Sequence, residues 1–140
     1  MCTQPRKVAA VQLAERVAVE MRTLPPSKDH PNLVACKQPG GADIAQSSIL
    51  FLTDASLLNQ LYYNPELPYV SAVVVDEVHE RSVNTDLLIA LLRRTLSLRA
   101  KKRKHPFKLV LTSATMNDAL FASYFARNKV IFEQRANDFL

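Results

Sequence analysis

Two adjacent carboxylates, Asp76 and Glu77, follow a run of β-branched residues in the stretch VVVDEVHERS, Val73 to Ser82. A hydrophobic strand that ends in Asp is one way in which nucleotide-hydrolysing sites hold magnesium. A neighbouring Glu can take a proton from the water that attacks the phosphate. The spacing therefore predicts a site for magnesium and a nucleotide, with Asp76 as the metal residue and Glu77 as the catalytic base.

Further polar side chains follow two other apolar runs of the sequence. Asp54 comes soon after the run that ends at Leu52, and Ser113 and Thr115 come after the run that ends at Leu111. In open α/β sheets, ligands bind in the crevice at the carboxyl ends of the strands. These side chains are therefore predicted to converge with the acidic pair at one edge of a sheet.

The elements that must position these groups are short apolar runs alternating with segments of helical spacing. Strands are predicted over residues 33–36, 48–52, 70–75, 107–111 and 130–132. Helices are predicted from Pro5 to before Pro25, from a cap at Thr53 or Asp54 to Pro65, over residues 84–98, and after a cap at Asn117. Because the strands are apolar throughout and alternate with helices, the pattern predicts an α/β fold with a parallel sheet covered by helices on both faces.

Several residues are predicted to face inward from these helices because they recur at helical spacing. The predicted inward residues are Ala10, Leu13, Ala14, Val17 and Met21, then Leu57, Leu58, Leu61 and Tyr62, then Leu88, Leu91, Leu92 and Leu96, and last Leu120, Phe121, Tyr124 and Phe125. Residues 23–47 hold four prolines and both glycines of the chain, and we interpret them as a surface loop or insertion.

Length and composition indicate one soluble, intracellular domain. The 140 residues are 48% hydrophobic, which suits a globular core, and no apolar run approaches the length of a membrane span or a signal peptide. Cys2 and Cys36 are far apart in the sequence and form no CxxC pair, so neither a disulfide framework nor a zinc site is indicated.

The net charge of +5 is unevenly placed. The segment from Arg93 to Lys108 holds eight basic residues and no acid, so the rest of the chain is acidic overall. Within this segment, the run RAKKRKHP, Arg99 to Pro106, fits a solvated loop between a helix and a strand, and it also fits contact with RNA or a nuclear-import signal. Since it precedes a strand, it is predicted to lie at the amino ends of the strands, away from the acidic pair.

Four blocks together carry a family resemblance: TQPRKVAA near the N-terminus, FLTDASLL, DEVHER, and LTSATM about thirty residues further on. In this order and spacing they resemble motifs Ia, Ib, II and III of the DEAH/DExH-box RNA helicases of superfamily 2, in the DEVH spelling. The resemblance covers nearly the whole chain apart from residues 23–47, and it implies part of the first RecA-like lobe, an incomplete P-loop NTPase domain over residues 1–140.

The resemblance implies a role for each matching residue, with ATP and Mg²⁺ as cofactors and RNA as a partner bound through its phosphates. It implies that Asp76 holds Mg²⁺ through water, that Glu77 activates the hydrolytic water, and that His79, Ser113 and Thr115 couple the nucleotide site to the RNA side. The residues implied to contact RNA are Thr3, Gln4, Arg6, Lys7, Thr53 and Asp54. It also leaves room for a protein activator. The basic run, taken as an import signal, favours a nuclear or nucleolar location, and the short apolar runs give no role to a membrane.

Taken one by one, these residues also have plain structural interpretations. His79 alone fits a structural histidine, Ser113 and Thr115 fit ordinary helix-capping hydroxyls, and Arg6 and Lys7 fit solvated residues of a first helical turn. A helix N-terminus disfavours cations unless a phosphate is near, which keeps the phosphate interpretation of Arg6 and Lys7 open.

A phosphate-cradling loop of the form G-x-x-x-x-G-K-[ST] cannot be written anywhere in these residues, because the only glycines are the adjacent Gly40 and Gly41. We therefore expect a fragment that lacks the phosphate-loop strand and the second lobe. Three alternatives stay open: an ATP-dependent RNA helicase, a degenerate lobe that binds RNA or a protein without ATP, and a DNA-directed member of the superfamily.

Overall fold

The computed structural model describes residues 1–22, 33–37, 47–102, 108–115 and 118–126. The elements in chain order are β1 (Cys2–Gln4), α1 (Lys7–Glu20), β2 (Val34–Cys36), β3 (Ile49–Thr53), α2 (Asp54–Tyr63), β4 (Ala72–Val75), the 3-10 turn η2 (Val78–Glu80), α3 (Val83–Lys101), β5 (Lys108–Leu111) and α4 (Asp118–Phe125). Among these residues, no helix is both long and apolar enough to cross a bilayer.

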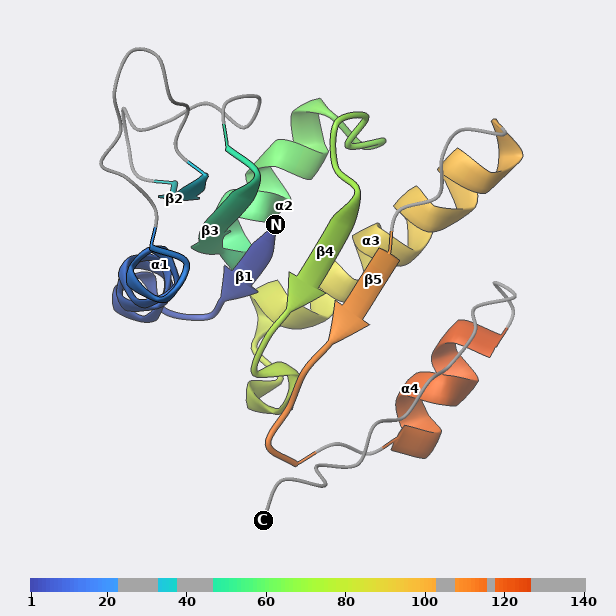
Figure 1. The fold of residues 1–140 in the computed structure, drawn as a ribbon. Coiled ribbons are helices and arrows are strands. Elements are labelled where there is room, and N and C mark those ends of the chain that lie inside the picture. The colour runs from blue at the N-terminus through green and yellow to red at the C-terminus, as the bar shows by residue number, and fades with distance from the viewer. Residues whose placement is uncertain (23–32, 38–46, 103–107, 116–117, 127–140) are drawn as a thin grey trace.

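The five strands form one parallel sheet in the order β2-β3-β1-β4-β5 (Figure 1). This confirms the predicted α/β fold with a parallel sheet. The central strand β1 was not predicted from the sequence. It is only three residues long and carries the polar Thr3 and Gln4, so it lacks the apolar run that marked the other strands.

Helices lie on both faces of the sheet, as predicted (Figure 1). On one face, Ala10 and Ala14 of α1 pack against Phe51 of β3. On the other face, α2, α3 and α4 share a larger core with the strands, built from Leu52, Leu57, Leu61, Leu67, Val70, Val73, Val75, Val78, Leu88, Ile89, Leu92, Phe121 and Phe125. This core fixes α2 and α3, whose N-termini follow β3 and the turn η2, at the carboxyl edge of the sheet.

Helix α1 covers only part of its face. The strand register places Phe51, Cys2, Val74 and Val110 in one row across β3, β1, β4 and β5. Phe51 and Cys2 belong to the cluster under α1, whereas Val110 is 43% exposed and neither it nor Val74 joins either core cluster. The face of β4 and β5 on this side is therefore open in the described part of the chain.

Most predicted elements match, with shifts at their ends. Helix α1 begins at Lys7 rather than Pro5, and Met21 lies beyond its end and is 45% exposed. In α2, Leu57 and Leu61 are buried as predicted, but Tyr62 is 80% exposed and the predicted inward position for it is wrong. The helix instead turns Asp54 and Gln60 inward with the two leucines, so Tyr62 falls outside the buried stripe.

The other inward predictions largely hold. Leu88 and Leu92 of α3 and Phe121 and Phe125 of α4 are buried. Leu120 and Tyr124 are 46% and 37% exposed, so the predicted inward position is wrong for these two. The short strand predicted within residues 23–47 is present as β2. The remainder of that predicted loop (residues 23–32 and 38–46), the Asn117 cap, the strand predicted at 130–132 and the centre of the basic run (residues 103–107) lie outside the described residues.

Candidate functional site at the carboxyl edge of the sheet

The register of the sheet lines up four polar side chains where the strands end. Gln4 pairs with Thr53, while Thr3 pairs with Val75 and Val75 with Leu111. The next residues along β1, β4 and β5 are therefore Gln4, Asp76 and Thr112, at the same level. The parallel sheet by itself brings these groups together at one edge, as the sequence predicted for Asp76.

Asp76 is half-buried and lies at the centre of this row. Its Oδ2 atom accepts a hydrogen bond of 2.6 Å from Gln4 Nε2, and its Oδ1 atom accepts from Thr112 Oγ1 at 2.5 Å and from the Glu77 backbone N–H at 2.9 Å. An ionised carboxylate offers about four acceptor positions. The three hydrogen bonds occupy three of these positions and fix the orientation of the carboxylate. One position of Oδ2 therefore stays available for a metal-bound water.

Glu77 and His79 lie on the turn that follows Asp76. His79 Nδ1 is 3.3 Å from Glu77 Oε2 and 3.2 Å from Ser113 Oγ. The Ser113 hydroxyl donates its only hydrogen to the Thr115 backbone oxygen at 2.7 Å, so it must accept from His79. The network thus assigns the proton to Nδ1 of His79. Through this nitrogen, His79 joins the Glu77 carboxylate to Ser113, in the segment after β5.

The backbone of this turn is strained at both ends. Glu77 and Arg81 flank η2, and both adopt left-handed conformations, with φ of 56° and 48°. A non-glycine residue in this region costs of order 1–3 kcal/mol, and such costs persist where the surroundings impose them, often at functional sites. Between these two residues, Val78 is buried and its N–H donates to the Thr112 carbonyl at 3.1 Å, which holds the turn against the end of β5.

The far end of the turn is tied to α3. Arg81 donates two hydrogen bonds to the Asp86 carboxylate, of 2.8 and 2.9 Å, and these lower the pKa of Asp86. The Ser82 hydroxyl caps α3 by accepting from the Thr85 N–H at 3.1 Å. The turn η2 is therefore fixed between β4 and the first turn of a long helix.

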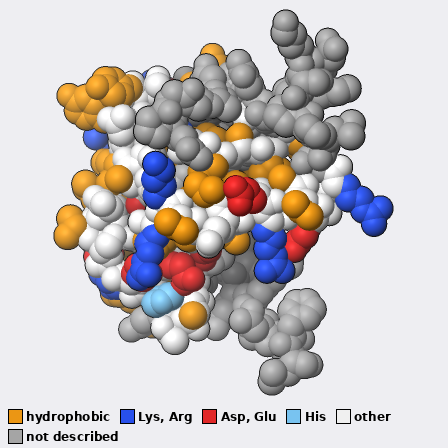
Figure 2. Space-filling model, turned by 90° about the vertical axis from the view of Figure 1, so that its left-hand side faces the viewer, with side chains coloured by type: hydrophobic (Ala, Val, Ile, Leu, Met, Phe, Trp, Pro, Cys, Tyr) orange, Lys and Arg blue, Asp and Glu red, His pale blue; other side chains and the backbone are white. Residues whose placement is uncertain are grey.

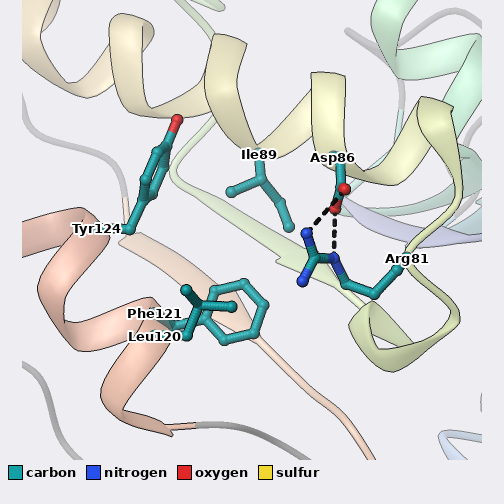
Figure 3. Close-up of a pocket in the computed structure, with 6 residues that line it drawn as sticks. All are labelled: Arg81, Asp86, Ile89, Leu120, Phe121 and Tyr124. Carbon is teal, nitrogen blue, oxygen red and sulfur yellow. Dashed lines mark hydrogen bonds and ion pairs between the residues drawn. The ribbon is translucent and has the colours of Figure 1, made fainter.

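A hollow of about 190 Å³ lies beside this anchor, between α3 and α4. Figure 3 shows the paired Arg81 and Asp86 at one end and apolar side chains facing them from α4; the lining is Arg81, Asp86, Ile89, Leu120, Phe121 and Tyr124. Arg93 places its guanidinium 4.4 Å from the centre of the Tyr124 ring, which helps to hold α4 against α3.

The residues expected to contact RNA divide by exposure. Arg6 and Lys7 are exposed at the N-terminus of α1, and the half-buried Thr53 uses its hydroxyl to cap α2 by accepting from the Ser56 N–H at 3.2 Å. Thr3 and Gln4 are 0% and 3% exposed, so their side chains lie beneath the surface. Gln4 is occupied instead by Asp76, which connects the two predicted sites directly.

Asp54 is also buried, at 2% exposed, and its Oδ2 accepts a hydrogen bond of 2.7 Å from Thr85 Oγ1. This bond ties the first turn of α2 to the first turn of α3. Its Oδ1 atom has no hydrogen-bond partner among the described residues. The structure therefore places Asp54 between the two helices rather than on the surface where a phosphate would lie.

The two side chains that donate hydrogen bonds to Asp76, those of Thr112 and Gln4, were not recognised in this role from the sequence. The signal for Thr112 was present, because it is the first residue after Leu111 just as Asp76 is the first residue after Val75. The signal for Gln4 needed β1 to be recognised as a neighbour of β4. Both omissions concern pairing across the sheet rather than residue type.

The charge around Asp76 affects a nearby thiol. Burial raises the pKa of Cys2, and the negative charge of Asp76 raises it further. The thiol is therefore neutral at ordinary pH and serves as an apolar group beneath the site.

In Figure 2, which faces the α1 side, a histidine lies beside acidic and basic side chains at the lower left, and further charged side chains are spread over the rest of this face. No group of three or more His, Cys, Asp or Glu side chains that could hold a metal occurs in the described parts of the chain. The residues present suit a magnesium ion that shares one carboxylate, keeps several waters and takes its other ligands from a phosphate.

Comparison with known proteins identifies relatives along almost the full length of this chain. A Schizosaccharomyces pombe protein named as a pre-mRNA-splicing factor ATP-dependent RNA helicase is 35% identical over 130 residues, which cover 92% of this chain and 18% of the relative. The probable ATP-dependent RNA helicase DHR1 of Saccharomyces cerevisiae is 37% identical over 137 residues, 93% of this chain and 10% of the relative.

The ATP-dependent RNA helicase DEAH12, chloroplastic, of Arabidopsis thaliana is 38% identical over 126 residues, 89% of this chain and 7% of the relative. The chain thus spans less than a fifth of the length of each of these three relatives. No family model matches it.

Proposed function

Because this chain belongs by sequence to the DEAH-box ATP-dependent RNA helicases, we propose that it serves as part of the first RecA-like lobe of such an enzyme. The reaction would be ATP hydrolysis coupled to the unwinding of RNA or the remodelling of RNA–protein complexes. The observation that carries this proposal is the hydrogen-bonded position of Asp76 between Gln4 and Thr112, with Glu77 and His79 on the next turn.

On the nucleotide side, Asp76 would hold Mg²⁺ through a water that occupies its free acceptor position. Bound Mg²⁺ offsets the negative charge of the phosphate oxygens. Glu77, whose side chain is 41% exposed, would orient the attacking water and accept its proton, with the His79 N–H holding the carboxylate in place. Ser113 and Thr115 would transmit a change at His79 to the segment after β5.

On the RNA side, Arg6 and Lys7 at the exposed N-terminus of α1 would contact backbone phosphates, together with the N-terminus of α2 at Thr53. Phosphate contacts carry no sequence information, which suits a motor that moves along any RNA. We assign the buried Thr3, Gln4 and Asp54 to positioning the exposed groups, with any contact of theirs to RNA made through the backbone.

ATP turnover provides the test. These 140 residues contain no glycine-rich loop with a lysine, so the chain alone should hydrolyse ATP negligibly even with RNA present. In a polypeptide that joins this chain to such a loop, Glu77→Gln should reduce turnover at least a hundredfold and leave nucleotide binding intact. Loss of nucleotide binding in the Glu77→Gln variant would instead give Glu77 a structural role.

A second candidate function is an ATP-independent module that binds RNA or a protein. It is favoured by the absence of a phosphate-cradling sequence in these residues. Binding of single-stranded RNA whose affinity is the same with and without magnesium–ATP, in a polypeptide containing the loop, would support this alternative. Comparing stimulation of turnover by RNA and by DNA would separate an RNA-directed enzyme from a DNA-directed one.

We propose the nucleus or nucleolus as the site of action. The splicing-factor name of the Schizosaccharomyces pombe relative and the basic run Arg93–Lys108 support this, although the Arabidopsis relative carries a chloroplast name. A fluorescent fusion should concentrate in the nucleus and should lose that concentration when Lys101, Lys102, Arg103 and Lys104 are replaced by glutamine.

A further inference from the structure

An ion pair joins the two halves of the proposed site. Arg6, at the cap position of α1, places its guanidinium Nη2 3.5 Å from Oε1 of Glu80, the last residue of η2. The Arg6 side chain is 78% exposed and that of Glu80 is 33% exposed. The pair therefore lies at the surface, where it is accessible to a ligand of either charge.

The surroundings of Arg6 favour an anion. The first turn of α1 contains no acidic residue, and Arg6 makes no side-chain cap, so the positive end of the helix has no negative side chain from its own helix. Lys7 adds a second exposed cation. Glu80 is therefore the anion that the structure supplies to this end of α1.

We propose that Glu80 is a positioning residue that occupies Arg6 until an RNA phosphate replaces it. This inference rests on the proposed RNA-binding function and assigns a role to a residue outside the sites given above. Exposed ion pairs are weak, so exchange of a carboxylate for a phosphate at Arg6 needs little energy. A phosphate also accepts two hydrogen bonds from a guanidinium in a forked geometry, which the 3.5 Å contact with Glu80 does not provide.

The exchange would reach the catalytic residues through a short path. The Glu80 N–H donates to the Glu77 carbonyl at 3.0 Å within the same turn, and Glu77 contacts His79. When Arg6 no longer pairs with Glu80, the negative charge of Glu80 is left unbalanced beside Glu77 and His79. RNA binding at α1 would thereby be felt by the carboxylate that activates water.

A double-mutant cycle on this chain tests the exchange. The probe is a fluorescently labelled oligouridine, and binding is measured by anisotropy at low salt. Arg6→Gln should weaken binding and reduce the salt dependence by about one phosphate contact. Glu80→Gln should tighten binding about two- to fivefold in the wild-type background and leave it unchanged in the Arg6→Gln background.

Glu20→Gln provides the matched control. Glu20 is an exposed acid that pairs with Arg16 at 2.8 Å, at the other end of α1, so its replacement makes the same charge change away from Glu80. It should change affinity less than Glu80→Gln. Equal tightening by the two variants, or tightening by Glu80→Gln that persists without Arg6, would overturn the proposal.

The second readout is the NMR spectrum of the catalytic turn. Adding oligouridine should shift the Glu77 amide and His79 imidazole signals, and the Glu80→Gln variant should lose that shift while still binding RNA. If the shift is unchanged in Glu80→Gln, the proposed path from Glu80 to Glu77 and His79 is wrong, while the exchange at Arg6 still stands. Absence of RNA binding in both the wild type and Glu80→Gln would contradict the RNA-binding function itself, and with it the exchange.

Discussion

The two halves of the sheet differ in how they are covered. Strands β2, β3 and β1 lie under α1, where Phe51 is only 6% exposed. Within the described residues, β4 and β5 have an open face on that side, and β5 is the last strand of the sheet. The opposite face is packed against α2 and α3 along most of its width. The polar row that holds Asp76 crosses from the covered half to the open half, from Gln4 to Thr112.

This difference separates the two proposed activities. The exposed RNA-side groups, Arg6 and Lys7, lie at the N-terminus of α1, the helix that covers β2, β3 and β1. The nucleotide-side groups, Asp76 and Thr112, stand at the ends of the strands whose other face is bare, and these residues contain no phosphate-cradling sequence. We infer that RNA contacts can form on this chain as it stands, whereas the nucleotide site needs groups that it does not supply.

The largest effect is expected from removing the anchor of the covered half. Phe51→Ala should lower the free energy of unfolding by about 3–5 kcal/mol, because it empties the space between β3 and α1. Denaturant unfolding followed by circular dichroism measures this. The control is Val110→Ala, at the open end of the same row, which should cost less than about 1 kcal/mol. Equal losses would mean that the two halves are equally packed.

The next effect concerns the caps that start α2 and α3 at the site. Thr53→Ala and Ser82→Ala should each cost about 1 kcal/mol, because each hydroxyl accepts a backbone N–H of its helix. Thermal unfolding measures the loss. Replacing Thr53 by Asp, another good cap, should restore most of it, and failure of this rescue would mean that the hydroxyl acts in some other way.

The open edge should promote self-association. β5 carries an apolar sequence and has no neighbouring strand on one side among the described residues, and such edges pair with other chains. Val110→Lys should shift the chain from aggregate toward monomer in analytical ultracentrifugation, while changing the free energy of unfolding by only about 0.5 kcal/mol. A monodisperse wild-type chain at high concentration would contradict this expectation.

The smallest effect is expected at the Arg81–Asp86 pair. The hydrogen bonds from Arg81 lower the pKa of Asp86, so the pair stabilises the fold above the ordinary pKa of Asp, about 3.9, and loses this contribution as the pH falls through the lowered value. Arg81→Gln should return the Asp86 pKa to its ordinary range in a carbon-detected NMR titration. Because both side chains are largely exposed, the stability change should be only a few tenths of a kcal/mol.

Much of this fold could be predicted from sequence because apolar runs mark buried strands. The strand over Ala72–Val75 and the long helix that follows it were predicted from this pattern. Strand β1 could not be, since two of its three residues are polar and its partners are distant in sequence. The short CTQ stretch is a strand because β3 and β4 lie on either side of it.

Contacts between residues distant in sequence also limited what could be predicted of the site. Asp76, Glu77 and Ser113 were predicted from residue type and position, and His79 from the family resemblance. The structure brings them within hydrogen-bonding reach of one another or of shared partners. The burial of Asp54 was not predicted. Its partner Thr85 is 31 residues away, and only the packing of α2 on α3 brings the two together.

Binding of a metal–nucleotide complex tests the central claim most directly. Mn²⁺ with a non-hydrolysable ATP analogue, added at millimolar concentration to the ¹⁵N-labelled polypeptide that joins this chain to a glycine-rich phosphate loop, should broaden the amide signals of Asp76, Glu77, Thr112 and Ser113 before all others within the residues of this chain, because Mn²⁺ prefers oxygen ligands and Asp76 offers one. The Asp76→Asn variant should lose this broadening. Broadening centred on another part of the chain, or unchanged in Asp76→Asn, would contradict the claim.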